Sequence, residues 1–124
     1  VYGEFVTEYA RNGATLFGII TNDAWWNNTE GHRQHLSYAR LRAIENRRYI
    51  ARSANTGISA IINAKGEIVS SLPYNTQGAI KGNVVLNNKL TFYAIAGDYI
   101  ARIALFVAIL VFMIAMFRRN RVKL

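Results

Sequence analysis

The 124-residue sequence has no cysteine, a single proline, two histidines and only seven acidic residues. Without cysteine, this chain can form neither a disulfide nor a thiolate metal site. Its two histidines, His32 and His35, would give a metal ion only two ligands, so we expect no metal and no cofactor. Because 52% of the residues are hydrophobic, the composition is that of a folded chain, and the length predicts one domain.

Half of the net charge of +8 comes from the end of the chain. Four basic residues, Arg118, Arg119, Arg121 and Lys123, follow an apolar run, and the remaining eleven are balanced in part by seven acidic residues. A nucleic-acid-binding domain would carry its basic residues on a folded face. The placement therefore favours a membrane partner and no nucleic acid.

The apolar run, residues 103–117, contains no charged or polar side chain. Extended back to Tyr99, it would span about 28 Å as a helix, which is close to the thickness of a bilayer core. A helix buried in a small soluble domain would rarely be apolar on every face. We expect a transmembrane helix at 99–117, a basic cytoplasmic tail at 118–124, and residues 1–98 on the opposite side of the membrane.

The order of helical and strand patterns in residues 1–98 predicts an α/β domain in which helices cover a layered sheet. The helices are expected at residues 1–13 and 32–48. The strands are expected at residues 14–21, 49–54, 58–63, 67–72 and 79–86. A loop at 22–31 separates the first strand from the second helix, and residues 87–98 are expected to be a linker.

The helix expected at residues 32–48 mixes apolar and charged side chains on one arc. At 100° per residue, its apolar arc consists of Leu36, Ala39, Ala43 and Ile44, and Arg40 and Arg47 fall within it. Glu45 can pair with Arg42 or with Arg48, and Arg48 is expected on a solvated face. His32 is expected to be an exposed loop residue, and His35 a packed or substrate-facing one.

The residues alone do not form a complete catalytic set. Asp23 could act as a base, but an Asn-Asp pair after a strand more often shapes a turn. Ser53 and Ser59 do not lie in a nucleophile elbow. The adjacent Trp25 and Trp26 suit packing or a membrane interface, unless a pocket lies beside them.

Three motifs, taken together, resemble one family. They are Thr21-Asn22-Asp23-Ala24-Trp25-Trp26, the Ala-Arg-x-Arg-Ala-x-Glu-Asn run at residues 39–46, and Arg52-Ser53-Ala54-Asn55-Thr56-Gly57-Ile58. In this order and spacing they resemble the carboxyl-terminal part of the apolipoprotein N-acyltransferases, whose catalytic domain belongs to the nitrilase superfamily. The resemblance covers nearly the whole chain, and a terminal membrane helix follows in both.

The resemblance implies the carboxyl-terminal part of a nitrilase-type α-β-β-α sandwich, on the periplasmic side of the bacterial inner membrane, followed by one transmembrane helix. The family transfers an acyl chain from a phospholipid donor to a lipoprotein acceptor through a cysteine thioester, using a Glu-Lys-Cys triad. None of the triad can be assigned to this chain, so the triad is expected upstream of Val1, beginning with an in-frame Cys-Tyr-Glu. The chain alone is expected to be inactive.

The resemblance also implies roles for residues of this chain. An active-site loop or substrate pocket is expected to include Asn22, Asp23, Trp25, Trp26, His35, Asn55 and Thr56. Three residues, Arg40, Glu45 and Asn46, are expected to be structural braces. Two alternatives stay open: a fragment of another membrane-anchored nitrilase-type amidase, and a non-catalytic membrane-anchored module.

The fragment interpretation predicts that residues 1–98, expressed alone, give no cooperative melt. Half of a nitrilase-type sheet would leave open edges and an uncovered face, so the segment should be poorly stable or aggregate. Calorimetry with size-exclusion chromatography checks this. A sharp transition from a soluble monomer would contradict the fragment interpretation.

Overall fold

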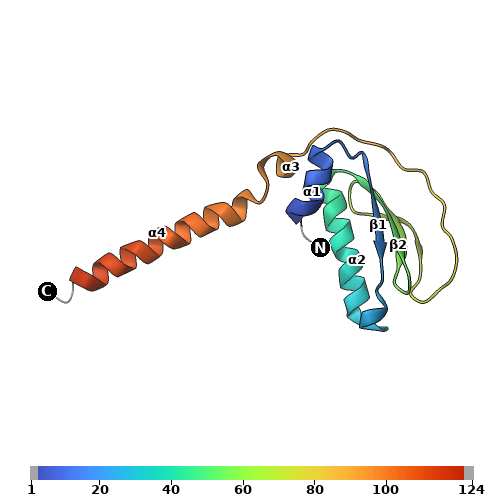
Figure 1. The fold of residues 1–124 in the computed structure, drawn as a ribbon, viewed down its shortest axis with the longest axis horizontal. Coiled ribbons are helices and arrows are strands. Elements are labelled where there is room, and N and C mark those ends of the chain that lie inside the picture. Colours follow the sequence, from blue (N-terminus) through green and yellow to red (C-terminus); the bar gives the residue numbers. More distant parts are fainter. Residues whose placement is uncertain (1–2, 122–124) are drawn as a thin grey trace.

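A computed structural model describes residues 3–121, and side chains are described as far as Arg119. An α/β unit is followed by one long helix that extends away from it (Figure 1). The elements are α1 (Gly3–Arg11), β1 (Leu16–Thr21), the 3-10 turn η1 (Ala24–Trp26), α2 (Glu30–Asn46), β2 (Tyr49–Ala54), β3 (Ser59–Ile62), β4 (Ile68–Leu72), α3 (Phe92–Ala96) and α4 (Tyr99–Arg121). The expected helix start at residues 1–2 and the end of the basic tail at 122–124 lie outside the described residues.

The four strands of the described chain form one sheet in the order β1-β2-β3-β4. Strands β1 and β2 are parallel, with Phe17 opposite Ile50, and α2 provides the crossover that a parallel pair requires. Strands β2, β3 and β4 are antiparallel neighbours. The β3–β4 hairpin turns at Gly66, whose φ of +80° explains the glycine there.

The core lies between the sheet and the helices α1 and α2, on the face of the sheet that these helices cover. Its buried side chains are those of Ala10, Phe17, Leu36, Ala39, Ala43, Ile50, Ala60 and Ile62. The chain after β4 passes around the opposite side of the sheet before reaching α3 (Figure 1). There Gly82 lies so close to Ile61 that a Cβ at Gly82 would come within 2.7 Å of Ile61 Cδ1.

One edge of the sheet, strand β1, has no neighbouring strand among the described residues. Ile20 on this strand is 93% exposed, and Phe5 and Tyr9 of α1 are also more than half exposed. An apolar cavity of about 460 Å³ lies between them. This is the open edge that the sequence analysis expected.

Two element predictions are wrong. Residues 79–86 form no strand, because the segment crosses the face of the sheet near Ile61 and does not pair with an edge. The expected linker at 87–98 contains the short helix α3, which Thr91 caps by accepting a hydrogen bond from Ala94 N at 3.0 Å. By contrast, the strand predicted at residues 49–54 is confirmed in full as β2.

Helix α2 begins earlier than expected and buries different residues. Thr29 caps its first turn, so that His32 lies inside the helix. His32 is predicted to be an exposed loop residue, but it is only 2% exposed, and its ring centroid lies 4.4 Å from that of Tyr74. Ile44, on the predicted apolar arc, is 41% exposed and lies over the hairpin turn at Gly66. Of the two partners predicted for Glu45, Arg42 and Arg48, the structure has Arg42, whose Nη2 lies 2.9 Å from Glu45 Oε1.

Arg48 was expected on a solvated face, and this is wrong, because the residue is fully buried. Its Nε donates to Ala14 O at 2.7 Å, and its Nη1 donates to Asn46 O at 3.0 Å and to Lys89 O at 2.9 Å. Burial lowers the pKa of Arg48 from its usual range. Periodicity could not reveal this role, because Arg48 follows the left-handed residue Arg47 (φ 52°), where the helical pattern has ended.

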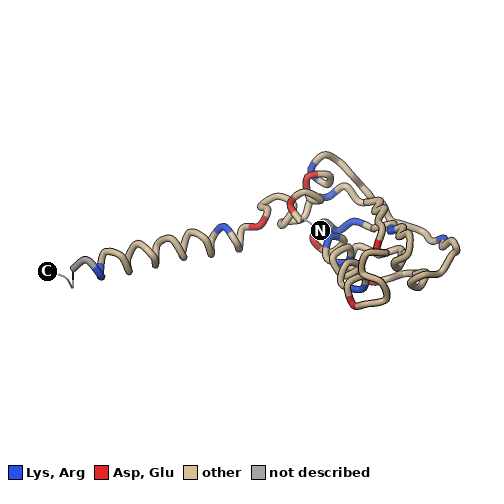
Figure 2. The backbone as a smooth tube through the Cα atoms, turned by 60° about the horizontal axis from the view of Figure 1, so that its bottom comes forward, with Lys and Arg blue, Asp and Glu red and all other residues tan. Residues whose placement is uncertain are grey.

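Helix α4 extends beyond the rest of the described chain and is exposed along its length. An 18-residue window within its segment Tyr99–Arg119 has a mean hydropathy of 2.7 and no buried residue, so the helix is long and apolar enough to cross a membrane. Charged residues of the helix lie only near its two ends (Figure 2). The helix predicted from the apolar run is therefore present, and it continues past residue 117 to Arg121.

Candidate functional site

The loop after β1 is built around Asp23, whose side chain is fully buried. Arg52 Nη2 donates to Asp23 Oδ2 at 2.6 Å. On the other oxygen, Oδ1, the carboxylate accepts from Thr21 Oγ1 at 3.2 Å and lies 2.9 Å from His35 Nδ1. Because an ionised carboxylate only accepts hydrogen bonds, Nδ1 is the ring nitrogen of His35 that carries the proton in this contact.

The topology brings the side chains of Asp23, Arg52 and His35 together. In the parallel pair, Thr21 at the end of β1 lies opposite Ala54 at the end of β2, so both strands end at the same edge. Asp23 follows β1, Arg52 lies in β2, and His35 comes from the helix that connects them. The carboxyl ends of parallel strands are the usual place for a ligand site in α/β proteins.

The charges at this edge keep Asp23 ionised. Burial by itself would raise the pKa of Asp23, but the hydrogen bonds from Arg52 and His35 outweigh it and hold the pKa below the usual value of 3.8. The contribution to stability is therefore present above that value and is lost as the pH falls through the lowered pKa. A carboxylate with two such partners is suited to holding the loop and poorly suited to accepting a proton.

The turn after β2 closes over Asp23. Asn55 N donates to Thr21 O at 2.9 Å, which joins the two strand ends. Gly57 lies against the carboxylate, so that a Cβ at Gly57 would be only 2.1 Å from Asp23 Oδ2. Arg52 also donates from Nη1 to Ile58 O. The turn at 55–57 and the loop at 22–23 are thus adjacent, and their role as a substrate pocket stays a prediction.

The two tryptophans of the loop differ in their surroundings. Trp26 packs against Gly31, and its ring centroid lies 5.0 Å from that of His35 in an edge-to-face arrangement. Trp25 is 82% exposed. The backbone between them and β1 is fixed by Asn22, whose Oδ1 accepts from Ala24 N at 3.1 Å. The loop therefore holds Trp26 in place and presents Trp25 outward.

The three residues predicted to be braces lie away from this loop. Arg40 Nε donates to Gly66 O at 2.7 Å, which ties α2 to the hairpin turn. Asn46 is fully buried and donates from Nδ2 to Arg42 O at 3.0 Å. Glu45 pairs with Arg42. The structure gives each of them contacts within the fold, and their role as braces stays a prediction.

Arg52 is the residue that the predicted site set did not contain. The strand sequence Tyr49–Ala54 carried a signal for it, because alternation in a strand places Arg52 on the same face as Ile50, which is fully buried. A charged residue on the core-facing side of a strand indicates a buried partner. The sequence alone does not identify this partner as Asp23, which lies 29 positions earlier.

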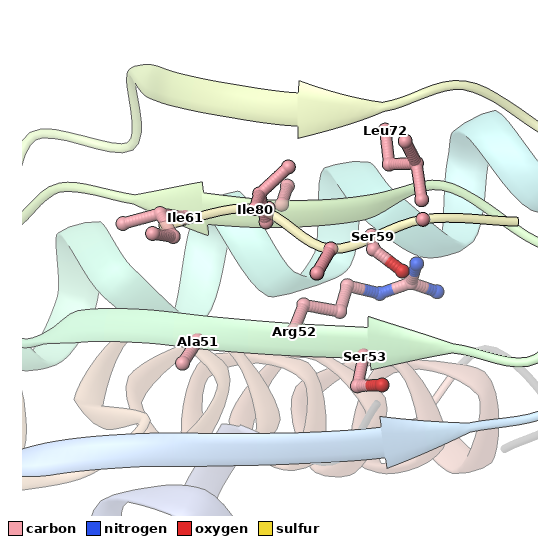
Figure 3. Close-up of a pocket in the computed structure, with 10 residues that line it drawn as sticks. Ala51, Arg52, Ser53, Ser59, Ile61, Leu72 and Ile80 are labelled. Carbon is pink, nitrogen blue, oxygen red and sulfur yellow. The ribbon is translucent and has the colours of Figure 1, made fainter. Parts of the chain in front are cut away.

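A cavity of about 340 Å³ lies on the other side of the sheet, beneath the crossing segment at 78–80. Ser53 and Ser59 lie toward one end of it, and Ile61 lies toward the other (Figure 3). None of the residues predicted for the substrate pocket lines this cavity. Among the described residues, no group of three or more His, Cys, Asp or Glu side chains is placed to hold a metal ion.

The contact between Gly57 and Asp23 predicts that Gly57→Ala destabilises the full-length protein by about 1–3 kcal/mol, because a Cβ would displace a buried carboxylate that cannot move away. Gly18→Ala in β1 is the matched control, since a Cβ there meets nothing within 4 Å, and its effect should stay within about 0.5 kcal/mol. Thermal unfolding in detergent measures both. Equal effects of the two substitutions would show that Gly57 does not need to be glycine.

Comparison with known proteins identifies the family. The carbon-nitrogen hydrolase family model matches residues 1–89. Three curated relatives are each called apolipoprotein N-acyltransferase: one from Chlorobaculum tepidum is 33% identical over 93% of this chain, one from Geobacter metallireducens 38% over 82%, and one from Rhizobium meliloti 43% over 73%. The chain spans 22%, 19% and 16% of those proteins, respectively. Together with the α/β fold, the match over most of its length shows that this chain belongs to the carbon-nitrogen hydrolase family.

Proposed function

We propose that this chain forms the carboxyl-terminal part of an apolipoprotein N-acyltransferase of a bacterial inner membrane. The observation that carries the proposal is a carbon-nitrogen hydrolase domain joined in one chain to an exposed helix apolar enough to cross a membrane. The similarity to the Chlorobaculum tepidum relative covers 115 of the 124 residues, so it includes much of α4 as well as the domain. An exposed helix of this length and apolarity would not be expected in a soluble amidase.

The proposed reaction has two steps, joined by a thioester. A cysteine thiolate attacks the ester carbonyl of a phospholipid acyl chain, forming the thioester and releasing a lysophospholipid. The amino group of the lipoprotein's diacylglyceryl-cysteine then attacks the thioester, forming an amide and regenerating the thiol. The intermediate divides one difficult transfer into two easier ones. The glutamate, lysine and cysteine of the triad are expected upstream of Val1.

This chain would contribute the shape of the site and its placement at the membrane. The Asp23–Arg52 contact holds the loop that presents Trp25, which is 82% exposed and suited to contact an acyl chain at a lipid boundary. The basic residues after the apolar run favour a cytoplasmic carboxyl terminus. Residues 1–98 would then lie in the periplasm, where the lipoprotein acceptor and the outer leaflet of the membrane are accessible.

Acyl transfer by the full-length protein tests the proposal, with a phospholipid carrying a labelled acyl chain as donor and a diacylglyceryl peptide as acceptor. We expect transfer of the label, and we expect Trp25→Ala to lower its rate roughly tenfold or more, since losing the burial of a large apolar side chain removes about 1.5–3 kcal/mol. Tyr38→Ala, at a 47% exposed position of α2, is the control.

Two results would contradict this account. Hydrolysis of small amides without any acyl transfer would indicate a different membrane-anchored amidase. If Trp25→Ala reduced thermal stability as much as it reduced transfer, Trp25 would be a packing residue and would not line a pocket.

A further inference from the structure

Helix α3 is fixed to the domain on its inner side. Ala94 is fully buried, and its carbonyl oxygen accepts from Arg11 Nε of α1 at 2.5 Å. Thr91, at the amino-terminal end of α3, donates from Oγ1 to Glu45 O of α2 at 2.5 Å. The short helix is therefore held by both helices of the domain, and its orientation is set by them.

The outer side of the same segment is apolar and exposed. Phe92 is 68% exposed, Ile95 67% and Leu90 43%. These three side chains, which we call the foot, are followed by Tyr99, whose ring centroid lies 5.2 Å from that of Phe92 in an edge-to-face arrangement. Scattered apolar residues are ordinary on a protein surface, but a cluster on one side of a fixed helix indicates a partner.

The joint between α3 and α4 is also fixed. Gly97 adopts a φ of +68°, and a Cβ there would come within 2.7 Å of Glu4 Oε1. That same oxygen accepts from Asp98 N at 3.0 Å and from Arg102 Nη2 at 2.9 Å. The backbone hydrogen bond from Asp98 N, together with the charge of Arg102, lowers the pKa of Glu4, so the carboxylate is ionised at neutral pH. The beginning of α4 is thus tied to the first turn of α1.

Two basic residues adjoin the foot, and an acidic residue follows it. Arg11 and Lys89 are exposed, Arg11 donates to Ala94 O, and Lys89 directly precedes Leu90. Asp98, which is also exposed, lies between α3 and α4. Apolar side chains flanked by cations match the boundary between acyl chains and phosphate headgroups.

We propose that the foot lies in the headgroup layer of the phospholipid bilayer, beside the point where α4 enters it. The inference rests on the proposal that α4 crosses a membrane. Because α3 is only two residues before α4 and both are fixed to α1, inserting α4 would bring the foot to the membrane surface. The foot would then set the height and tilt of the domain, and so the distance from the loop at Trp25 to the lipid.

Photocrosslinking of the full-length protein in phosphatidylethanolamine–phosphatidylglycerol vesicles tests this. A diazirine amino acid replaces Ile95 in the foot, Ile109 in the middle of α4, or Val69, which is 53% exposed on β4. We expect the yield of lipid adducts at positions 95 and 109 to be roughly tenfold higher than at position 69, because only those two positions would contact the bilayer.

The controls separate the two proposals. If position 109 forms no lipid adduct, α4 does not cross the membrane, and the proposed function fails with it. If position 109 forms lipid adducts while the adduct yield at position 95 equals that at position 69, α4 crosses the membrane but the foot does not lie in the headgroup layer. Adducts from position 95 to protein would show that a protein segment covers the foot, which also overturns the lipid assignment.

Discussion

The buried contact between Asp23 and Arg52 is the interaction on which the loop depends. Two charges removed from water are tolerated only when they pair closely and have further hydrogen bonds, and here the carboxylate has His35 and Thr21 while the guanidinium has Ile58 O. If either partner were lost, the other would be a buried charge without compensation, at a cost of about 3–5 kcal/mol. The pair thereby joins the end of β1, the end of β2 and the helix that connects them.

The constraint extends to the residues around the pair. Gly57 has to be small because the carboxylate occupies the space of a Cβ. His35 is oriented by Asp23 and in turn packs against Trp26. The loop conformation that leaves Trp25 exposed is therefore a consequence of a charge pair beneath it, not of the local sequence of the loop alone.

A second set of contacts relates this domain to helix α4. Arg48 is buried where the end of α2, the chain just before β1 and the segment before α3 meet, and it donates to a carbonyl group of each. Glu4 continues the connection from α1 to the start of α4. A domain fixed in this way has a defined orientation on α4, which would suit an enzyme whose proposed donor lies in the bilayer.

The sequence was informative where a pattern was regular or a motif was complete. The uniform apolarity of residues 103–117 predicted α4, and the strand predicted at residues 49–54 matches β2 to the residue. The family and the α/β nitrilase-type fold came from the motif set, and the family match confirms them. Sequence patterns failed where tertiary contacts determine the structure. The segment at 79–86 is extended but crosses the sheet without pairing, and the residues next to Arg48 in the sequence do not indicate that its side chain donates to three carbonyl groups. Arg52 and Asp23 could each be singled out, but their pairing depends on strand register, which a single sequence does not contain.

A double-mutant cycle on Asp23 and Arg52 tests the central claim most directly. The free energy of unfolding of the full-length protein would be measured for Asp23→Asn, Arg52→Gln and the combination. If the pair holds the loop, each single substitution should cost about 3–5 kcal/mol, and the double variant should cost little more than either, since no unpaired charge is left. If the two costs simply add, the residues act independently and the loop does not depend on their contact.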